Sequence, residues 1–465
     1  MNRGVLLAAG VAAVLAGVLF TRPHATPGPA MRDFEAYYAA GSLWQHRVWP
    51  YDTRIWRAER NIAGVDASRY EVLPFVGPPA LLPAFASLAY LPFDRAVLVW
   101  RALLLCAMAA IVICALSLAG VRLSPMTILA GATAAIGFGP LTSALALGQI
   151  ALPAFAFAAI AAWLPAAGFL AWIQPNVALA NVWQCARRKG ALALVAGLGV
   201  FATACAAVVG RARIAGYLSV LQEHGAAEKF SAIQMTPAAI AYGFGATESL
   251  AAVIGVALAL AAIALWFALL PRLPDNASRF AATCALLPVA MPFFHEHDLL
   301  VLFIPAIVVT LRADARVWPI AAAGAMLCAT DWLGLAQRPD GLVQTLLLVG
   351  GLGAALFALR RDARARMLAI PVCVLAAIAV AGVFAQAHPS PVWPDAMSAL
   401  PANVRTMSVA SAWHAEQAAT GLLSRNGAWA LLRLLSLLGC ALLVSAVWLS
   451  SRSTVDSKNP LPVPA

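Results

Sequence analysis

Long apolar runs separated by short polar breaks form the main pattern along this chain. A helix needs roughly 20 apolar residues to cross a bilayer, and the apolar windows leave room for about 12 to 14 such helices. The pattern therefore predicts an all-α polytopic membrane protein. We expect residues 1–450 to form one integral membrane domain and residues 451–465 to form a cytoplasmic tail.

Three longer polar segments interrupt this pattern, at residues 21–75, 211–248 and 386–426. The first follows the apolar run 4–20. We interpret that run as an uncleaved anchor, because residues 24–27 make a poor signal-peptide cleavage site. With the N-terminus in the cytoplasm, all three segments are expected on the extracytoplasmic side. The stretch 31–71 is rich in tyrosine and acidic residues, so we expect the chemistry there.

The positions of the charges agree with this orientation. Only 11% of the residues are charged, against about 25% in soluble domains. The net charge of +11 lies largely in short breaks, so no nucleic-acid partner is expected. Arginine outnumbers lysine strongly, which indicates a GC-rich bacterial genome and a multi-pass protein of the bacterial inner membrane. Four basic breaks fall on the cytoplasmic side, as the positive-inside rule expects: Arg187, Arg272, Arg312 and Arg360.

The first polar segment predicts two short helices lying at the membrane surface. Aromatic and small residues recur at helical spacing from residue 34 to residue 44: Phe34, Tyr37, Tyr38, Gly41 and Trp44. Asp33 stands where an N-cap would. A break at residues 49–52 follows, and Asp52 is placed to cap a second helix.

No cofactor or metal is expected. The eight cysteines lie mostly in apolar segments without a CxxC motif, so we interpret them as buried thiols that form no disulfides. His295-Glu296-His297-Asp298 lacks the HExxH spacing, and residues at i and i+2 do not share a helical face. No phosphate-binding glycine loop, dinucleotide fingerprint or serine nucleophile elbow occurs in the sequence.

The order of motifs in the first hundred residues resembles glycosyltransferase family 87. The motifs are Asp33-Phe34-x-x-Tyr37-Tyr38-x-x-Gly41, Pro50-Tyr51-Asp52 and Pro78-Pro79-x-Leu81-Leu82, followed later by Gly148-Gln149 and by His295. The resemblance implies the GT-C membrane fold and a mannosyltransferase that uses polyprenyl-phosphate mannose. One departure is Gln174-Pro175-Asn176, where the family commonly has a Lys-x-Pro element.

Asp33 is the candidate catalytic residue. Glycosyl transfer needs a carboxylate to accept the proton of the attacking hydroxyl, whereas the phosphate leaves without acid assistance. The alternative role of Asp33 is the helix N-cap. We expect Glu35 to be a solvated surface residue, because it points away from Asp33, and Asp52 to be a cap rather than a base.

The substrate and its phosphate need further contacts, for which arginine is well suited. The candidates are Tyr37, Tyr38, Asp52, Gln149, Arg211, Arg213, Lys229 and His295, with Arg54, Arg57 and Arg433 as further cations. For Arg433, inside an apolar run, snorkelling to lipid headgroups is the favoured interpretation. The expected acceptor is a glycolipid, a glycan or a protein.

Two other functions remain open at this point. A transporter or lipid flippase would have ionisable residues near the middle of the membrane. It would also have discontinuous helices at corresponding positions of two paired halves. Here the acidic residues gather in the outer segments instead. A non-catalytic paralogue that only binds polyprenyl lipids is the other alternative, and the departure at Gln174 keeps it open.

Overall fold

The computed structural model describes residues 3–20, 31–62, 73–186, 188–338, 340–360, 365–389 and 398–456, and these residues are helical with connecting loops. Arg187 and parts of the segments 21–75, 386–426 and 451–465 lie outside the described residues. No β-strand occurs in the described part, where one isolated antiparallel bridge pairs Gln234 with His295. The predicted all-α membrane fold is confirmed.

The elements follow the apolar pattern, with η marking 3₁₀ helices. The first part of the chain contains α1 (Arg3–Phe20), α2 (Arg32–Gln45), α3 (Arg54–Arg60), η2 (Pro79–Leu81), α4 (Leu82–Leu88), α5 (Phe93–Leu118), α6 (Pro125–Ile136), α7 (Gly139–Leu147), α8 (Ala151–Ile160), η3 (Pro165–Ile173), α9 (Pro175–Ala178), η4 (Leu179–Ala186), α10 (Arg188–Val209) and α11 (Arg211–Glu228). The second part contains α12 (Pro237–Gly243), α13 (Glu248–Leu269), η5 (Leu270–Arg272), α14 (Asn276–Ala290), η6 (His297–Leu302), α15 (Phe303–Arg312), α16 (Trp318–Cys328), α17 (Trp332–Gln337), α18 (Gly341–Leu359), η7 (Ala365–Leu368), α19 (Ala369–Gln386), η8 (Val404–Thr406), α21 (Val409–Ala419) and α22 (Gly427–Asp456).

Six helices among the described residues are long and apolar enough to cross a membrane: α5, α10, α13 with η5, α18, α19 and α22. Helices α6 and α7 together would make a seventh, but they are bent by 74° where they meet. The count of about 12 to 14 crossing helices stays a prediction. Glycine and proline divide several apolar runs into helices too short to cross a bilayer alone.

Polar side chains fix where many of the helices begin. Each of six residues accepts a hydrogen bond from a backbone N–H of the first turn, as N-caps do: Ser124, Thr236, Thr247, Asp275, Asp331 and Ser408. These caps lie between apolar runs, so the breaks in the hydrophobic pattern coincide with real helix ends.

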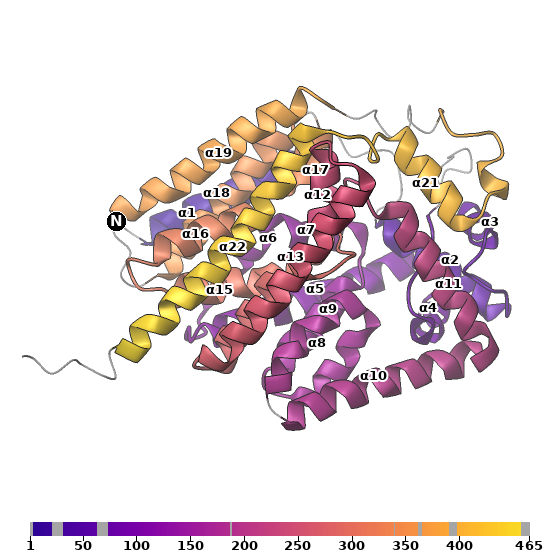
Figure 1. Cartoon of the computed structure of the whole chain (residues 1–465), viewed down its shortest axis with the longest axis horizontal. Helices are drawn as coiled ribbons and strands as arrows, with labels where there is room; N and C mark the ends of the chain where they lie inside the picture. The colour runs from indigo at the N-terminus through magenta and orange to yellow at the C-terminus, as the bar shows by residue number, and fades with distance from the viewer. Residues whose placement is uncertain are drawn as a thin grey trace, which may run out of the picture.

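Elements from distant parts of the chain gather at one end of the molecule. Figure 1 shows α2, α3, α4, α11 and α21 on one side of the bundle, away from α1, α18 and α19. Helix α2 packs against α3 and α4, while α11 packs against α21. The three polar segments of the sequence therefore meet in space.

Helix α2 differs from the predicted surface helix, because it is packed on most sides. A Cβ on Gly41 would collide with the backbone carbonyl of Phe85, so α2 and α4 approach each other closely there. Glu35 is fully buried, and its predicted solvent exposure is wrong because the second face of α2 is covered as well. Asp52 does accept a hydrogen bond from the backbone N–H of Arg54, at 3.0 Å, at the start of α3.

Candidate active site

Helix α2 carries Asp33 in its first turn. The chain enters the helix at Met31 with φ 68°, the helix begins at Arg32, and no side chain caps it. The expectation that Asp33 is an N-cap is therefore wrong. The predicted aromatic face packs inward, and Tyr37 stacks on Phe85 with ring centroids 5.0 Å apart. This packing fixes the start of α2 and leaves the carboxylate of Asp33 without a capping role.

The Gly148-Gln149 pair closes α7 directly against α2. Gly148 has φ 82°, and a Cβ there would lie 3.0 Å from the Cβ atoms of both Met31 and Phe34. Both the backbone angle and the space favour glycine. Its carbonyl accepts a hydrogen bond of 2.8 Å from the indole of Trp100. The turn thus points Gln149 at the first turn of α2.

Gln149 connects Asp33 to Tyr37. Its side-chain nitrogen donates to Oδ2 of Asp33, and its side-chain oxygen accepts from the Tyr37 hydroxyl at 3.0 Å. The amide is thereby held in one orientation, with its donor toward the carboxylate. Oδ1 of Asp33 hydrogen-bonds to no described residue, so it is available to a substrate.

The surroundings of Asp33 favour proton exchange near neutral pH. Burial raises the pKa of Asp33 to about 6, while Arg32, the Gln149 hydrogen bond and His295 act in the lowering direction. A carboxylate with such a pKa is mostly ionised at pH 7 yet is a stronger base than a solvated aspartate.

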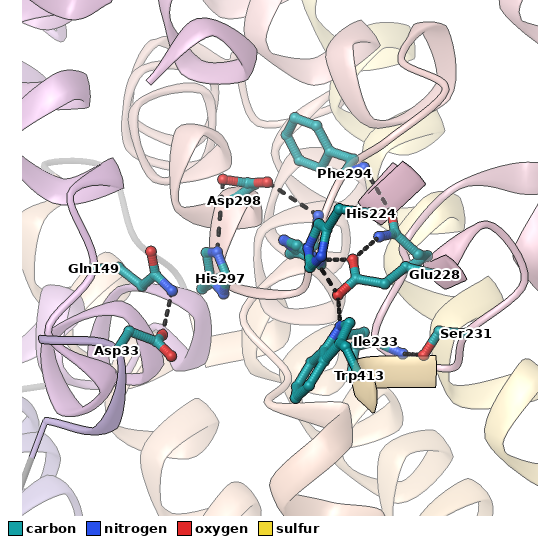
Figure 2. A network of polar contacts seen from close by, with 12 residues as sticks. Asp33, Gln149, His224, Glu228, Ser231, Ile233, Phe294, His297, Asp298 and Trp413 are labelled. Carbon is teal, nitrogen blue, oxygen red and sulfur yellow. Dashed lines mark hydrogen bonds and ion pairs between the residues drawn. The ribbon is translucent and has the colours of Figure 1, made fainter. Parts of the chain in front are cut away.

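Glu228, the last residue of α11, is the centre of a buried polar network. Its carboxylate contacts Nε2 of His295 at 2.8 Å and Nε2 of His224 at 3.2 Å. Gln234 donates to the same carboxylate at 3.0 Å, and the indole of Trp413 donates to its other oxygen. Figure 2 shows His224 and Trp413 beside the carboxylate of Glu228. All three polar segments of the sequence thus contribute to the site.

The network keeps His295 protonated at neutral pH. Burial acts to lower the pKa of His295, but Glu228, Asp298 and Asp33 outweigh it and raise the pKa to about 8. Burial likewise acts to raise the pKa of Glu228, yet His224 and His295 hold it well below its usual range. The result is a cationic imidazole paired with a buried carboxylate.

The loop before α12 holds this arrangement in place. Gln234 accepts from the backbone N–H of Phe294 at 2.9 Å, next to its bridge with His295. Arg433 of α22 donates to the carbonyls of Ser231 at 3.4 Å and Gln234 at 3.1 Å. Arg433 is buried under this loop, so the predicted snorkelling to lipid headgroups is wrong.

His297 lies between the two parts of the site in Figure 2, with Asp33 and Gln149 on one side and the Glu228 network on the other. Burial and the neighbouring charge of His295 outweigh the carboxylates and lower the pKa of His297 to about 4, so its imidazole is neutral at pH 7. The site therefore combines a carboxylate, a neutral histidine and a cationic histidine.

Three side chains of this region have the chemistry of metal ligands. One ligand atom from each of His295, His297 and Asp298 lies within 4.8 Å of the others. Donors around one zinc ion lie about 2 Å from it, so such a set would have to contract. The expectation of no metal stays a prediction.

Several of the predicted cations lie away from this site. Arg211 and Arg213 begin α11, and a helical rise of 1.5 Å per residue places Arg213 about 22 Å from Glu228. The guanidinium of Arg213 lies over the ring of Trp49, 5.8 Å from its centroid. Lys229 follows Glu228 directly but is exposed, with its amine 5.3 Å from the ring centroid of Phe230.

Two other candidates have local partners. The Tyr38 hydroxyl donates to the carbonyl of Leu91 at 2.8 Å, so it does not join Tyr37 at Gln149. Asp52 accepts from the guanidinium of Arg54 at 2.9 Å, and Arg57 is exposed on the same short helix. Among the predicted residues, the structure brings together Asp33, Tyr37, Gln149 and His295.

Glu228, Gln234 and Trp413 were not assigned a role from the sequence. The spacing of His224 and Glu228, four residues apart on a helix, is the one signal that identifies a pair on one face. No local pattern connects Gln234 or Trp413 to this pair. Gln174 precedes α9, which packs against η6, so the departure from the family pattern lies near the element that begins at His297.

A family model, that of glycosyltransferase family 87, matches residues 75–293. The match includes Gly148-Gln149, Gln174 and Glu228, begins after α2 and ends two residues before His295. The resemblance inferred from the sequence is confirmed. No curated protein and no solved structure matches the chain.

Proposed function

We propose that this multi-pass membrane protein, whose residues 75–293 match the model of glycosyltransferase family 87, transfers a hexose from a polyprenyl-phosphate donor to an acceptor hydroxyl. By family resemblance the hexose is mannose. Asp33 is the general base in this proposal. The observation that carries it is the Asp33 carboxylate, which is held by Gln149 and lies on one side of His297, with the Glu228 network on the other (Figure 2).

The proposed reaction is a single displacement at the anomeric carbon. Oδ1 of Asp33 accepts the proton of the acceptor hydroxyl as the hydroxyl oxygen forms the new glycosidic bond. The bond between the anomeric carbon and the phosphate oxygen breaks, and polyprenyl phosphate leaves with the electron pair. The configuration at the anomeric carbon is inverted relative to the donor.

His295 is the proposed contact for the leaving phosphate. Its imidazolium, paired with Glu228, supplies a fixed positive charge where negative charge develops, and such preorganised groups stabilise transition states. Arg211 and Arg213 lie too far along α11 for this role. We place the site on the extracytoplasmic side, as the alternation of basic and acidic breaks favours.

The test is an assay of the purified full-length protein with polyprenyl-phosphate mannose and a panel of glycolipid, glycan and peptide acceptors. We expect release of polyprenyl phosphate only with a suitable acceptor. Asp33→Asn should lower the rate by about 10²–10⁴-fold, the usual contribution of a general base. The amide of Gln149 can still donate to the side-chain oxygen that this substitution retains, so the variant should fold.

The matched control is Glu223→Gln, which removes an exposed carboxylate from α11 and should retain wild-type turnover. Wild-type turnover by Asp33→Asn would remove Asp33 from the mechanism. Donor binding without release, with every acceptor, would identify a non-catalytic lipid-binding protein instead.

A further inference from the structure

A groove of about 580 Å³ lies where α2 ends and where α10 meets α11. Two arginines, Arg47 and Arg213, line it together with Trp44, Gln45 and the last turn of α10. The groove is separate from the candidate active site, because Gln45 is about 18 Å from Asp33 along α2 at 1.5 Å per residue. The mechanism proposed above uses neither arginine.

Arg47 occupies a backbone position that the fold would more readily give to glycine. Its φ is 58°, and it follows α2 in a turn in which Val48 N–H donates to the carbonyl of Leu43 at 2.9 Å. This is the helix-ending turn in which a left-handed residue, usually glycine, follows the helix. Ending the helix does not require a large cationic side chain. The presence of Arg47 at this unfavourable backbone position therefore suggests that its side chain binds a ligand.

Arg213 is held in the same groove by an aromatic ring. Its guanidinium lies 5.8 Å from the ring centroid of Trp49, within cation–π distance. Among the described residues, neither Arg213 nor Arg47 has a carboxylate within ion-pair distance. Two exposed guanidinium groups without a counter-charge make the groove a favourable place for an anion.

The surroundings of the groove are those expected at a membrane boundary. Helix α10 has 22 residues and is about 33 Å long at 1.5 Å per residue, enough to cross the hydrocarbon core. Its outward side chains are apolar and exposed, for example Leu192, Val195 and Val200, which identifies a lipid-facing flank. Trp44 and Trp49 stand at its far end, as aromatic belts do at the interface.

We infer that this groove binds the headgroup phosphate of an anionic membrane lipid whose chains lie along α10. Arginine binds phosphate oxygens in bidentate fashion, and the two guanidinium groups face the level at which lipid phosphates lie. The apolar flank of α10 continues from the groove, so one lipid molecule can place its phosphate in the groove and its acyl chains along α10.

The experiment is a titration of the detergent-purified full chain with phosphatidylglycerol or phosphatidylcholine, followed by native mass spectrometry. We expect phosphatidylglycerol to bind more tightly. Arg47→Gly and Arg213→Gln should each weaken it by roughly tenfold, the effect of losing charge-assisted hydrogen bonds. Arg47→Gly keeps the turn in a form that glycine favours, so its unfolding temperature should not fall.

The matched control is Arg211→Gln, which removes an exposed cation two residues from Arg213 but outside the groove. Its affinity for phosphatidylglycerol should equal that of the wild type. Equal weakening by Arg211→Gln would mean general attraction to anionic lipid and would overturn the inference. Unchanged affinity in Arg47→Gly and Arg213→Gln, or inorganic phosphate binding as tightly as the lipid, would overturn it too.

Discussion

At the scale of single residues, Asp33 and His295 have opposite charges at neutral pH and opposite tasks in the proposed reaction. Burial makes the Asp33 carboxylate a better base, whereas Glu228 keeps the His295 imidazole protonated despite burial. Neighbouring titratable groups whose pKa values are both displaced from their usual values are typical of catalytic sites. Gln149 supports this pair by orienting the Asp33 carboxylate. Its amide is neutral, so it adds no charge of its own.

This pair predicts a bell-shaped dependence of activity on pH. Asp33 must be ionised to accept a proton, so the rate should rise as pH increases through about 6, the pKa of that carboxyl. His295 must be protonated to bind the phosphate, so the rate should fall above about 8, the pKa of that imidazole. Initial rates of polyprenyl phosphate release across the range from acidic to alkaline buffers measure both limbs.

Substitution at position 295 separates the two limbs. His295→Gln keeps a polar side chain but cannot titrate, so the alkaline limb should disappear while the acidic limb remains. If His295→Gln instead lost only the acidic limb, the proposed assignment of the two limbs to Asp33 and His295 would be reversed.

Sequence reasoning identified residues that act through local motifs and missed those that act through distant contacts. Asp33, Tyr37, Gln149 and His295 stand in recognisable motifs, and the structure gathers them. The errors at Asp33 as an N-cap, at Glu35 and at Arg433 share a cause. A helical pattern shows which side chains share a face, but it does not show whether the opposite face is covered by another part of the chain.

At the scale of elements, the site depends on how closely α2 and α7 meet. Gly148 ends α7 with a left-handed backbone, and the first turn of α2 fills the space where its side chain would be. This contact places the side chain of Gln149 within hydrogen-bond distance of Asp33. We therefore expect both stability and the proposed catalysis to depend on Gly148.

Gly148→Ala should destabilise the protein and lower activity together. The left-handed backbone costs an alanine about 1 kcal/mol, and the close contacts with Met31 and Phe34 add about 1–3 kcal/mol of overpacking. Gly120→Ala is the matched control, because Gly120 has φ 76° with open space around it and should show only the first term. Thermal unfolding in detergent compares them, and equal losses would mean that the α2–α7 contact is unimportant.

At the scale of the whole molecule, composition is enough to predict the fold class. It is not enough to predict how many helices cross the membrane. Hydropathy counts apolar residues, but a break such as Gly137–Gly139 bends the chain by 74° without making it polar. The grouping of α2, α11 and α21 around one site was likewise invisible, because it depends on tertiary packing. The side of the membrane on which this group lies stays a prediction.

Cysteine labelling tests that side. In a cysteine-free variant, Lys229→Cys should react with a membrane-impermeant maleimide added to intact cells with a permeable outer membrane, because Lys229 is exposed beside Glu228. Lys189→Cys, exposed at the opposite end of α10, should react only after the inner membrane is opened. The reverse pattern would place the site in the cytoplasm.

Arg433 has a consequence for the order in which the protein becomes functional. The carbonyls of Ser231 and Gln234 accept hydrogen bonds from Arg433 of α22, a helix that is synthesised long after α2. During translation the Asp33 side of the site can assemble long before that helix emerges from the ribosome. The histidine side acquires this support only after α22 has been inserted. We therefore expect a nascent chain that still lacks α22 to leave the Ser231–Gln234 loop unsupported and to be inactive in the proposed reaction.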